Sequence, residues 1–220
     1  MQVLFQYPER AKLGKIVPKT KFYKYSKLTK QSKNSFISDI AQIVWLYNIS
    51  PETVNLPATK DVPEIQIFKV DLKIKEYDID LINVIDESIP FPTLFELQYD
   101  QESKTVAAFK RPNEASAVKW VISDYFEGEW ILSNSTRTPM PVAVNLEGLY
   151  GQLLKTIMPY SDKTGENIKD RVLRTEQIRQ VEKEIIKCET KLQIEKQYNI
   201  KVEINAELRK LNKKLKDLTK

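Results

Sequence analysis

The 220-residue sequence has no histidine, one cysteine and five glycines, and each scarcity removes a class of chemistry. Without histidine there is no Ser-His-Asp or Cys-His nucleophile system and no imidazole general base. Cys188 alone cannot form an intramolecular disulfide or a Cys/His zinc site. The pair Gly148 and Gly151 lacks the Gly-Lys-Ser/Thr of a P-loop, so we expect no nucleotide cofactor. Because histidine is absent and there is one cysteine, we also expect no standard metal site.

Long apolar runs are also missing. The longest are a few residues, whereas a helix needs about 20 to span a bilayer, and the N-terminus does not resemble a secretory leader. Hydrophobic residues still make up 41% of the chain and aromatic residues 10%, which is enough for a core. We therefore expect a folded cytoplasmic protein that does not enter a membrane.

The net charge of +5 is divided into three blocks. Residues 1–34 hold nine Lys and Arg against one acid, residues 35–162 hold 10 against 19, and residues 163–220 hold 16 against 10. The corresponding net charges are +8, −9 and +6. This division favours a basic N-terminal arm over 1–34, an α+β domain over 35–160 and a C-terminal coiled-coil helix over 161–220.

The basic arm interleaves lysine with tyrosine and phenylalanine. Its candidate nucleic-acid-binding residues are Lys19, Lys21, Lys24, Lys27 and Lys30. Ammonium groups displace counterions from a phosphate backbone and aromatic faces stack on unpaired bases, so the arm predicts contact with DNA or RNA. The alternative is that these lysines form the solvated face of a short helix or complement the acidic block within the chain.

The middle block predicts an α+β fold with a small mixed β-sheet packed by helices. Apolar residues at three-to-four spacing predict a helix from Phe36 to Tyr47. Alternation over 65–74 predicts a strand, with a β-bulge where its phase slips at Phe68. A helix over 79–85 follows, with Asp78 as its cap.

Three more strands and a helix complete this block. Strands are predicted over 93–99 and 105–109, joined by a polar turn, and over 118–126, with a turn at Gly128. A helix is predicted over 146–157. Trp45, Trp120 and Trp130 fall within these elements, where aromatic residues are more often core than ligand platforms.

One catalytic alternative comes from the strand over 65–74. Asp71 and Lys73 resemble the acid-x-Lys pattern with which some nucleases hold Mg²⁺ and position a water. Glu64 would lie about 23 Å from Asp71 on an extended strand, too far to share an ion. A second acid such as Glu96 or Asp124 would have to come from another strand, while alternating charges are also typical of a solvated sheet face.

The last 55 residues contain no proline or glycine and carry two heptad stretches. The predicted interface residues are Ile178, Val181, Ile185, Cys188 and Leu192, and then Ile204, Leu208, Leu211, Leu215 and Leu218. The 12-residue step from Leu192 to Ile204 breaks the register, which indicates either a stutter or a turn. Because no turn residues mark the middle, we expect one long helix that forms a homodimer, with a hairpin near Tyr198 as the alternative.

A family resemblance spans residues 15 to 131. It is carried by four segments: Lys21-Phe22-Tyr23, Trp45 to Asn55, Glu64 to Lys73 and Ile85 to Phe95. At this spacing the chain resembles a bacterial family known as domain of unknown function 4391. The resemblance implies a gene neighbourhood of helicases and DNA methyltransferases in phage-defence loci, and it supplies no catalytic residues.

Together these observations favour a non-enzymatic accessory or scaffold protein. We expect it to self-associate through its coiled coil, or to form a hetero-complex with a helicase or methyltransferase, and to contact DNA or RNA through the arm. A Mg²⁺-dependent nuclease at Asp71 and Lys73 is the alternative.

Overall fold

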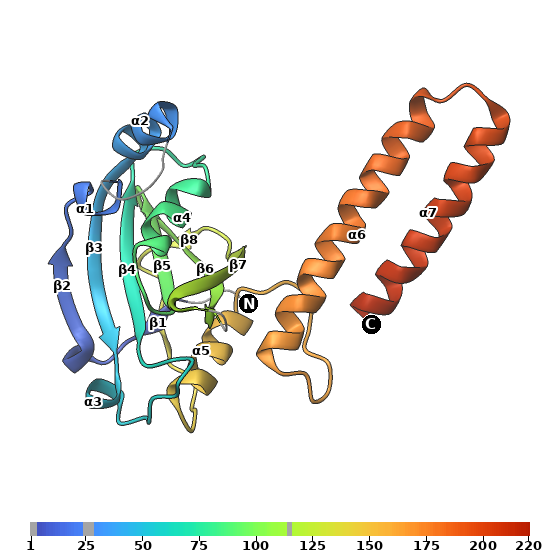
Figure 1. Ribbon diagram of the computed structural model, residues 1–220. Coiled ribbons are helices and arrows are strands. Elements are labelled where there is room, and N and C mark those ends of the chain that lie inside the picture. Colours follow the sequence, from blue (N-terminus) through green and yellow to red (C-terminus); the bar gives the residue numbers. More distant parts are fainter. Residues whose placement is uncertain (1–3, 24–28, 114–115) are drawn as a thin grey trace. The chain divides into compact units, whose positions relative to one another are not determined.

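The computed structural model describes residues 4–23, 29–113 and 116–220 (Figure 1). The chain divides into two compact units, Met1–Met158 and Pro159–Lys220. The first unit is α+β and the second is a pair of helices. No helix within the described ranges is long and apolar enough to cross a membrane.

A mixed seven-stranded sheet forms the first unit. Its strands are β2 (Lys12–Ile16), β3 (Ile40–Ile49), β4 (Ile65–Leu72), β5 (Thr93–Tyr99), β6 (Glu102–Asn113), β7 (Ser116–Glu127) and β8 (Ile131–Leu132). The order is β2-β3-β4-β5-β6-β7, and β8 also pairs with β6. All neighbours are antiparallel except β4 and β5, which run parallel. The predicted mixed sheet is confirmed.

Short helices surround this sheet. They are η1 (Glu9–Ala11), α1 (Thr20–Tyr23), α2 (Lys30–Asp39), α3 (Pro51–Val54), α4 (Asp80–Glu87) and α5 (Leu146–Lys155). A separate two-stranded ribbon pairs β1 (Phe5–Gln6) in parallel with β9 (Thr138–Pro139). Helix α4 overlaps the helix predicted over 79–85 and ends at Glu87. Its N-cap is Ile79 and not Asp78, although the Asp78 carboxylate accepts a hydrogen bond from the backbone N–H of Asp80 at 3.0 Å.

One face of the sheet packs on α2 and α4. In β4 and β5 the paired residues Phe68 and Phe95 point to this face, as do Val70 and Leu97. The buried cluster that they join consists of Phe22, Phe36, Ile40, Ile43, Phe68, Val70, Leu72, Leu81, Ile82, Val84, Ile85, Ile89, Phe95, Leu97 and Val106. Because side chains alternate along a strand, the residues between these positions in β4 and β5 point to the opposite face of the sheet.

The opposite face is covered by the ends of the first unit. Glu96 lies between Phe95 and Leu97 and so points away from α4, and its carboxylate accepts two hydrogen bonds from Arg137 at 2.9 Å. Arg137 also donates to the backbone carbonyl of Phe5 at 2.8 Å, which fixes the N-terminal segment. Helix α5 reaches the same face, where Tyr150 stacks on Phe109 with ring centroids 6.1 Å apart.

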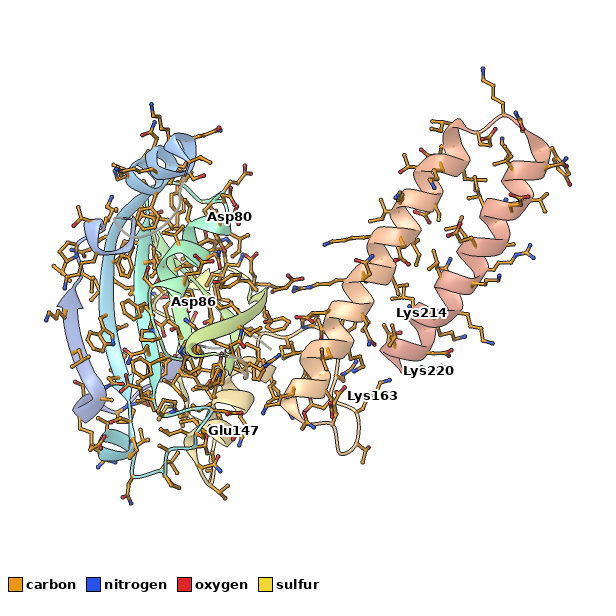
Figure 2. The ribbon with its side chains drawn as sticks, in the orientation of Figure 1. Asp80, Asp86, Glu147, Lys163, Lys214 and Lys220 are labelled. Atoms are coloured by element: carbon orange, nitrogen blue, oxygen red, sulfur yellow. The ribbon has the colours of Figure 1, made fainter. Side chains whose placement is uncertain are left out.

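A buried ion pair connects α4 to the sheet. Lys110 of β6 and Asp86 of α4 are each only 1% exposed, and Lys110 Nζ lies 2.8 Å from Asp86 Oδ1. Figure 2 labels Asp86. The same ammonium donates to the backbone carbonyls of Asp86 and Ile89, which lie at the end of α4. The other carboxylate oxygen accepts from Tyr125 of β7 at 3.0 Å. Burial raises the pKa of Asp86 and lowers the pKa of Lys110, and their contact opposes both shifts.

The helix predicted from Phe36 to Tyr47 is wrong. Helix α2 ends at Asp39, and residues from Ile40 onward form β3 between β2 and β4. The strand buries Ile40, Ile43 and Val44, which lie at helix-like spacing because both faces of the sheet are covered. The segment is rich in β-branched and aromatic residues, which fit a pleated strand better than a helix.

The other elements of the first unit agree better with the sequence. The strands over 93–99, 105–109 and 118–126 and the helix over 146–157 are confirmed as β5, β6, β7 and α5. The irregularity near Phe68 exists, but the register shift places the extra residue, Leu46, in the partner strand β3. Strand β2 lies within what was predicted to be a basic arm.

The second unit is a helical hairpin, so the expectation of one long helix is wrong. Helix α6 spans Ile168–Ile194 and α7 spans Tyr198–Thr219, and the two helices contact each other along their lengths. Glu195 ends α6 in an extended conformation, and its carboxylate accepts from the backbone N–H groups of Lys196 and Gln197 at 2.7 and 2.8 Å. The Glu195 carboxylate therefore stabilises a turn that contains no glycine or proline.

We predict that Lys110→Met lowers the free energy of unfolding of the first unit by about 3 to 5 kcal/mol, because Asp86 and two carbonyls would remain buried without their cation. Trp45, Trp120 and Trp130 all precede Met158, so tryptophan fluorescence in urea reports on this unit.

The matched control is Lys69→Met, which breaks a partly exposed pair with Asp71 and should cost about 1 kcal/mol or less. Asp86→Leu combined with Lys110→Met should recover part of the loss, since both charges are then removed. A Lys110→Met loss no larger than that of the control would contradict the assignment.

Candidate functional site

The structure places Asp71 of the nuclease alternative in β4 and Lys73 just after that strand. Asp71 pairs with Lys69 at 3.0 Å, and the register places it opposite Gln42 of β3 and Gln98 of β5. Lys73 follows the end of β4, and its backbone N–H donates to the carbonyl of Asp39. Within the described residues, no group of three or more Asp, Glu or Cys side chains is arranged to hold a metal ion.

The candidate second acids have other contacts. Glu96 is 4% exposed and its carboxylate is bound by Arg137. Asp124 lies in β7 and also has an interaction partner. Glu64 accepts from Asn48 Nδ2 at 3.1 Å and from Gln66 Nε2. The carboxylates considered in the sequence therefore take part in local contacts in the described part of the chain.

The predicted nucleic-acid-binding lysines that the structure describes have different surroundings. Lys19 folds back on the end of α2, where its Nζ donates to the carbonyl oxygens of Ile37 and Ile40. Burial, and next the charge of Lys73, lower the pKa of the Lys19 ammonium. Lys30 is exposed at the first residue of α2, and Lys21 is exposed in α1. Lys24 and Lys27 lie outside the described residues.

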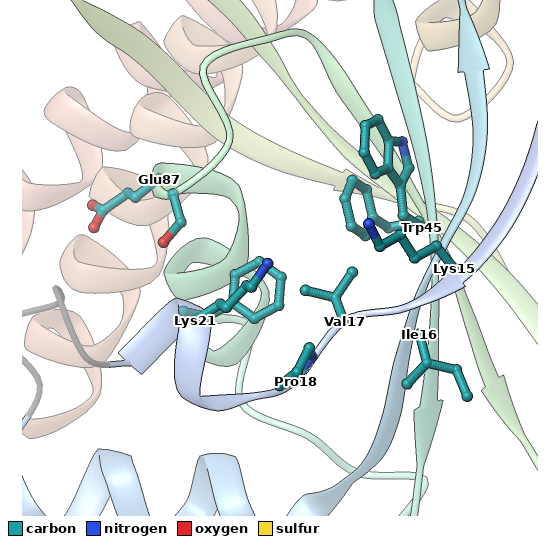
Figure 3. Close-up of a pocket in the computed structure, with 10 residues that line it drawn as sticks. Lys15, Ile16, Val17, Pro18, Lys21, Trp45 and Glu87 are labelled. Atoms are coloured by element: carbon teal, nitrogen blue, oxygen red, sulfur yellow. The ribbon is translucent and has the colours of Figure 1, made fainter.

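A pocket of about 790 Å³ lies between β2, α1 and the end of α4 (Figure 3). Its lining residues are Lys15, Ile16, Val17, Pro18, Lys21, Phe22, Trp45, Phe68, Glu87 and Ser88. The rings of Trp45 and Phe68 lie almost parallel, with centroids 6.1 Å apart. Trp45 Nε1 is buried and has no hydrogen-bond partner among the described residues. The lining therefore combines two stacked aromatic rings with charged groups of both signs, from Lys15, Lys21 and Glu87.

The heptad residues of the hairpin are unequally buried. On α6, Ile178, Val181, Ile185 and Cys188 are buried, whereas Leu192 is only partly buried. On α7 none is fully buried: the partly exposed residues are Ile204, Leu208, Leu211, Leu215 and Leu218. The two helices therefore pair through the predicted residues, and the leucine row of α7 keeps contact with solvent.

Charged groups close the open end of the hairpin. Arg174 is 7% exposed, and its guanidinium donates to Glu166 through two nitrogens at 2.6 Å and to the carbonyls of Ser161 and Leu218. Lys163 Nζ donates to the carbonyl of Asp217. The last carbonyls of α7 are thus bound by cations, which also suits the negative end of a helix. Cys188 lies within the seam, and burial raises the pKa of its thiol, so it is unreactive packing.

We predict that the hairpin weakens as the pH falls because of Glu166. Its hydrogen bonds with Arg174 lower the pKa of the carboxyl. A lowered pKa contributes stability that is present above the ordinary carboxyl pKa and is lost as pH falls through the folded-state pKa. Glu166→Gln should cost about 1 to 3 kcal/mol at neutral pH and should remove this pH dependence.

Urea unfolding followed by circular dichroism at 222 nm, at pH 7 and at pH 4, measures both effects. Glu184→Gln is the control, since Glu184 accepts only from Gln180 in the described structure. Equal pH dependence in wild type and Glu166→Gln would refute the assignment.

Comparison with known proteins identifies one family. Residues 5–215 match the family model described as Domain of unknown function (DUF4391). No curated protein and no solved structure gives a significant match. The match covers the sheet and both helices of the hairpin, so it extends beyond the segments that carried the resemblance in the sequence. The chain belongs to the DUF4391 family.

Proposed function

We propose that this protein is a non-enzymatic docking protein, in which the helical hairpin forms the assembly surface of a folded α+β unit. The observation that carries the proposal is the partial exposure of every heptad residue on α7, from Ile204 to Leu218. Two helices bury only part of an a/d row, and further helices are needed to exclude solvent from it.

Exposed apolar residues near the turn support this proposal. Ile186 and Ile194 on α6 are 62% and 75% exposed, and Tyr198 and Val202 on α7 are 78% and 51% exposed. These residues lie near the turn between the helices and extend the apolar surface beyond the seam. Exposed apolar surface of this kind is typical of an interaction site.

A second copy of the chain is the partner that we propose first. Two hairpins related by a twofold axis would form a four-helix bundle, in which the same leucine row is buried in both copies. A helicase or DNA methyltransferase partner and a role in phage defence come from the family resemblance alone. If the partner is such an enzyme, one of its helices would pack against the leucine row of α7.

The test is the mass of the full-length protein in solution. By light scattering we expect twice 25.7 kDa for the wild type and a monomer for Leu211→Asn combined with Leu215→Asn. The matched control is Lys210→Asn combined with Lys214→Asn, one position earlier on the same helix, and it should remain dimeric. Unchanged helicity at 222 nm shows that each variant is folded.

A monomeric wild type would overturn the homodimer. The seam would then be tested by copurification from the host, where the same leucine variant should lose a specific enzyme that the lysine control retains. Retention by both variants would refute docking through this row.

The nuclease alternative keeps a direct test. We expect no cleavage of plasmid DNA in Mg²⁺ or Mn²⁺, because Asp71 is paired with Lys69 and no group of three or more acidic or cysteine side chains among the described residues is arranged to hold a metal ion. Cleavage that is lost in both Asp71→Ala and Lys73→Ala would show that the protein is a nuclease and that docking is not its whole function.

A further inference from the structure

Basic residues are concentrated at the C-terminal end of α7. The segment 209–220 contains six Lys and Arg and one acid, a net charge of +5, whereas 198–208 contains one lysine and two glutamates. The six cations are Arg209, Lys210, Lys213, Lys214, Lys216 and Lys220, and all are exposed. Figure 2 labels Lys214 and Lys220 in this part of the helix. The excess positive charge of α7 therefore lies in its C-terminal half.

Four of the cations form a row. At about 100° per residue, Arg209, Lys213, Lys216 and Lys220 lie within about 60° of one another, on the side opposite Leu211 and Leu215. The row is about 16 Å long at 1.5 Å per residue. At the same spacing Lys210 lies about 60° from the nearest member of the row, and Lys214 lies nearer to the leucine row than to the basic row. Because the leucine row faces the other way, this basic face stays accessible in the proposed dimer as well as in the hairpin alone.

Two structural explanations do not account for the row. The helix dipole favours cations only in the last turn, and Lys163 and Arg174 already bind the terminal carbonyls, so Arg209 and Lys213 gain nothing from it. The solvent-exposed positions of a coiled coil need polar residues, and charges of both signs meet that need. Helix α6 shows this pattern, with seven Lys and Arg against five acids over Ile168–Ile194.

We propose that this face of α7, defined by Arg209, Lys213, Lys216 and Lys220, binds the phosphate backbone of nucleic acid. A row of exposed cations with the same sign at each turn matches a polyanion whose charges repeat along its length. No aromatic residue lies between Arg209 and Lys220, so the face has no base-stacking group and binding is independent of sequence. The site is separate from the lysines of the N-terminal segment.

The experiment is a titration of fluorescent 20-base-pair DNA with full-length protein at several salt concentrations. We expect the logarithm of the affinity to fall linearly with the logarithm of salt, with a slope proportional to the number of phosphates contacted. Lys213→Gln, Lys216→Gln and Lys220→Gln combined should reduce this slope by about 2 to 3 units. A scrambled duplex should bind equally, and RNA of the same length should show the same loss.

The control removes the same charge from α6. Lys183→Gln, Lys187→Gln and Lys191→Gln combined also removes three exposed cations, from a helix in which seven Lys and Arg are mixed with five acids. This variant should keep the wild-type slope. An equal loss in both variants would overturn the site, because net charge alone would then explain binding.

Polyglutamate distinguishes an acidic protein partner from nucleic acid. Competition by polyglutamate as effective as that by DNA, at equal charge, would overturn the proposal in favour of an acidic protein surface. Absence of DNA binding at 50 mM salt would overturn it as well. The titration contains no protein partner, and the Leu211 and Leu215 variant tests docking separately, so the two proposals can fail independently.

Discussion

The ammonium of Lys110 holds the layers of the first unit together. Pairing of β6 with β5 ends at Val106, and beyond it the backbone of β6 needs other partners. Tyr150 of α5 supplies them, since its hydroxyl accepts from the N–H of Lys110 and donates to the carbonyl of Ala108. The side chain of the same lysine binds the end of α4 on the opposite face. Both layers are therefore fixed to residues 108–110 of β6. The buried ammonium of Lys110 needs its partners on α4, so this lysine also fixes the position of that helix.

This arrangement explains which elements could be predicted from the sequence. Strands β5, β6 and β7 follow one another closely along the chain, so their alternation and the polar residues between them are sufficient to find them. Strand β3 is different because it is covered on both faces, and its apolar residues fall by chance at the spacing of a helix. The turn between α6 and α7 is the less favoured of the two sequence predictions for a local reason. A glutamate carboxylate satisfies the backbone there, and sequence rules look for glycine or proline.

The candidate sites were less predictable than the fold, because charge in a sequence does not show which groups pair. Lys19 looked like a phosphate ligand and instead binds carbonyls at the end of α2. Glu96 looked like a metal ligand and instead holds Arg137. Both uses depend on contacts between residues at least 18 positions apart. The heptad residues were found because their spacing alone places them on one side of a helix, whichever partner that side meets.

The division into units changes the meaning of the net charge. Residues up to Met158 contain 19 basic and 19 acidic residues, and residues from Pro159 contain 16 and 11. The basic N-terminal segment and the acidic block therefore belong to one neutral unit, and the whole excess of +5 belongs to the hairpin. Long-range attraction of a polyanion depends on this excess, because the opposite charges of the first unit cancel beyond about one Debye length. The hairpin thus supplies both the exposed apolar seam and the unbalanced charge, on opposite sides of α7.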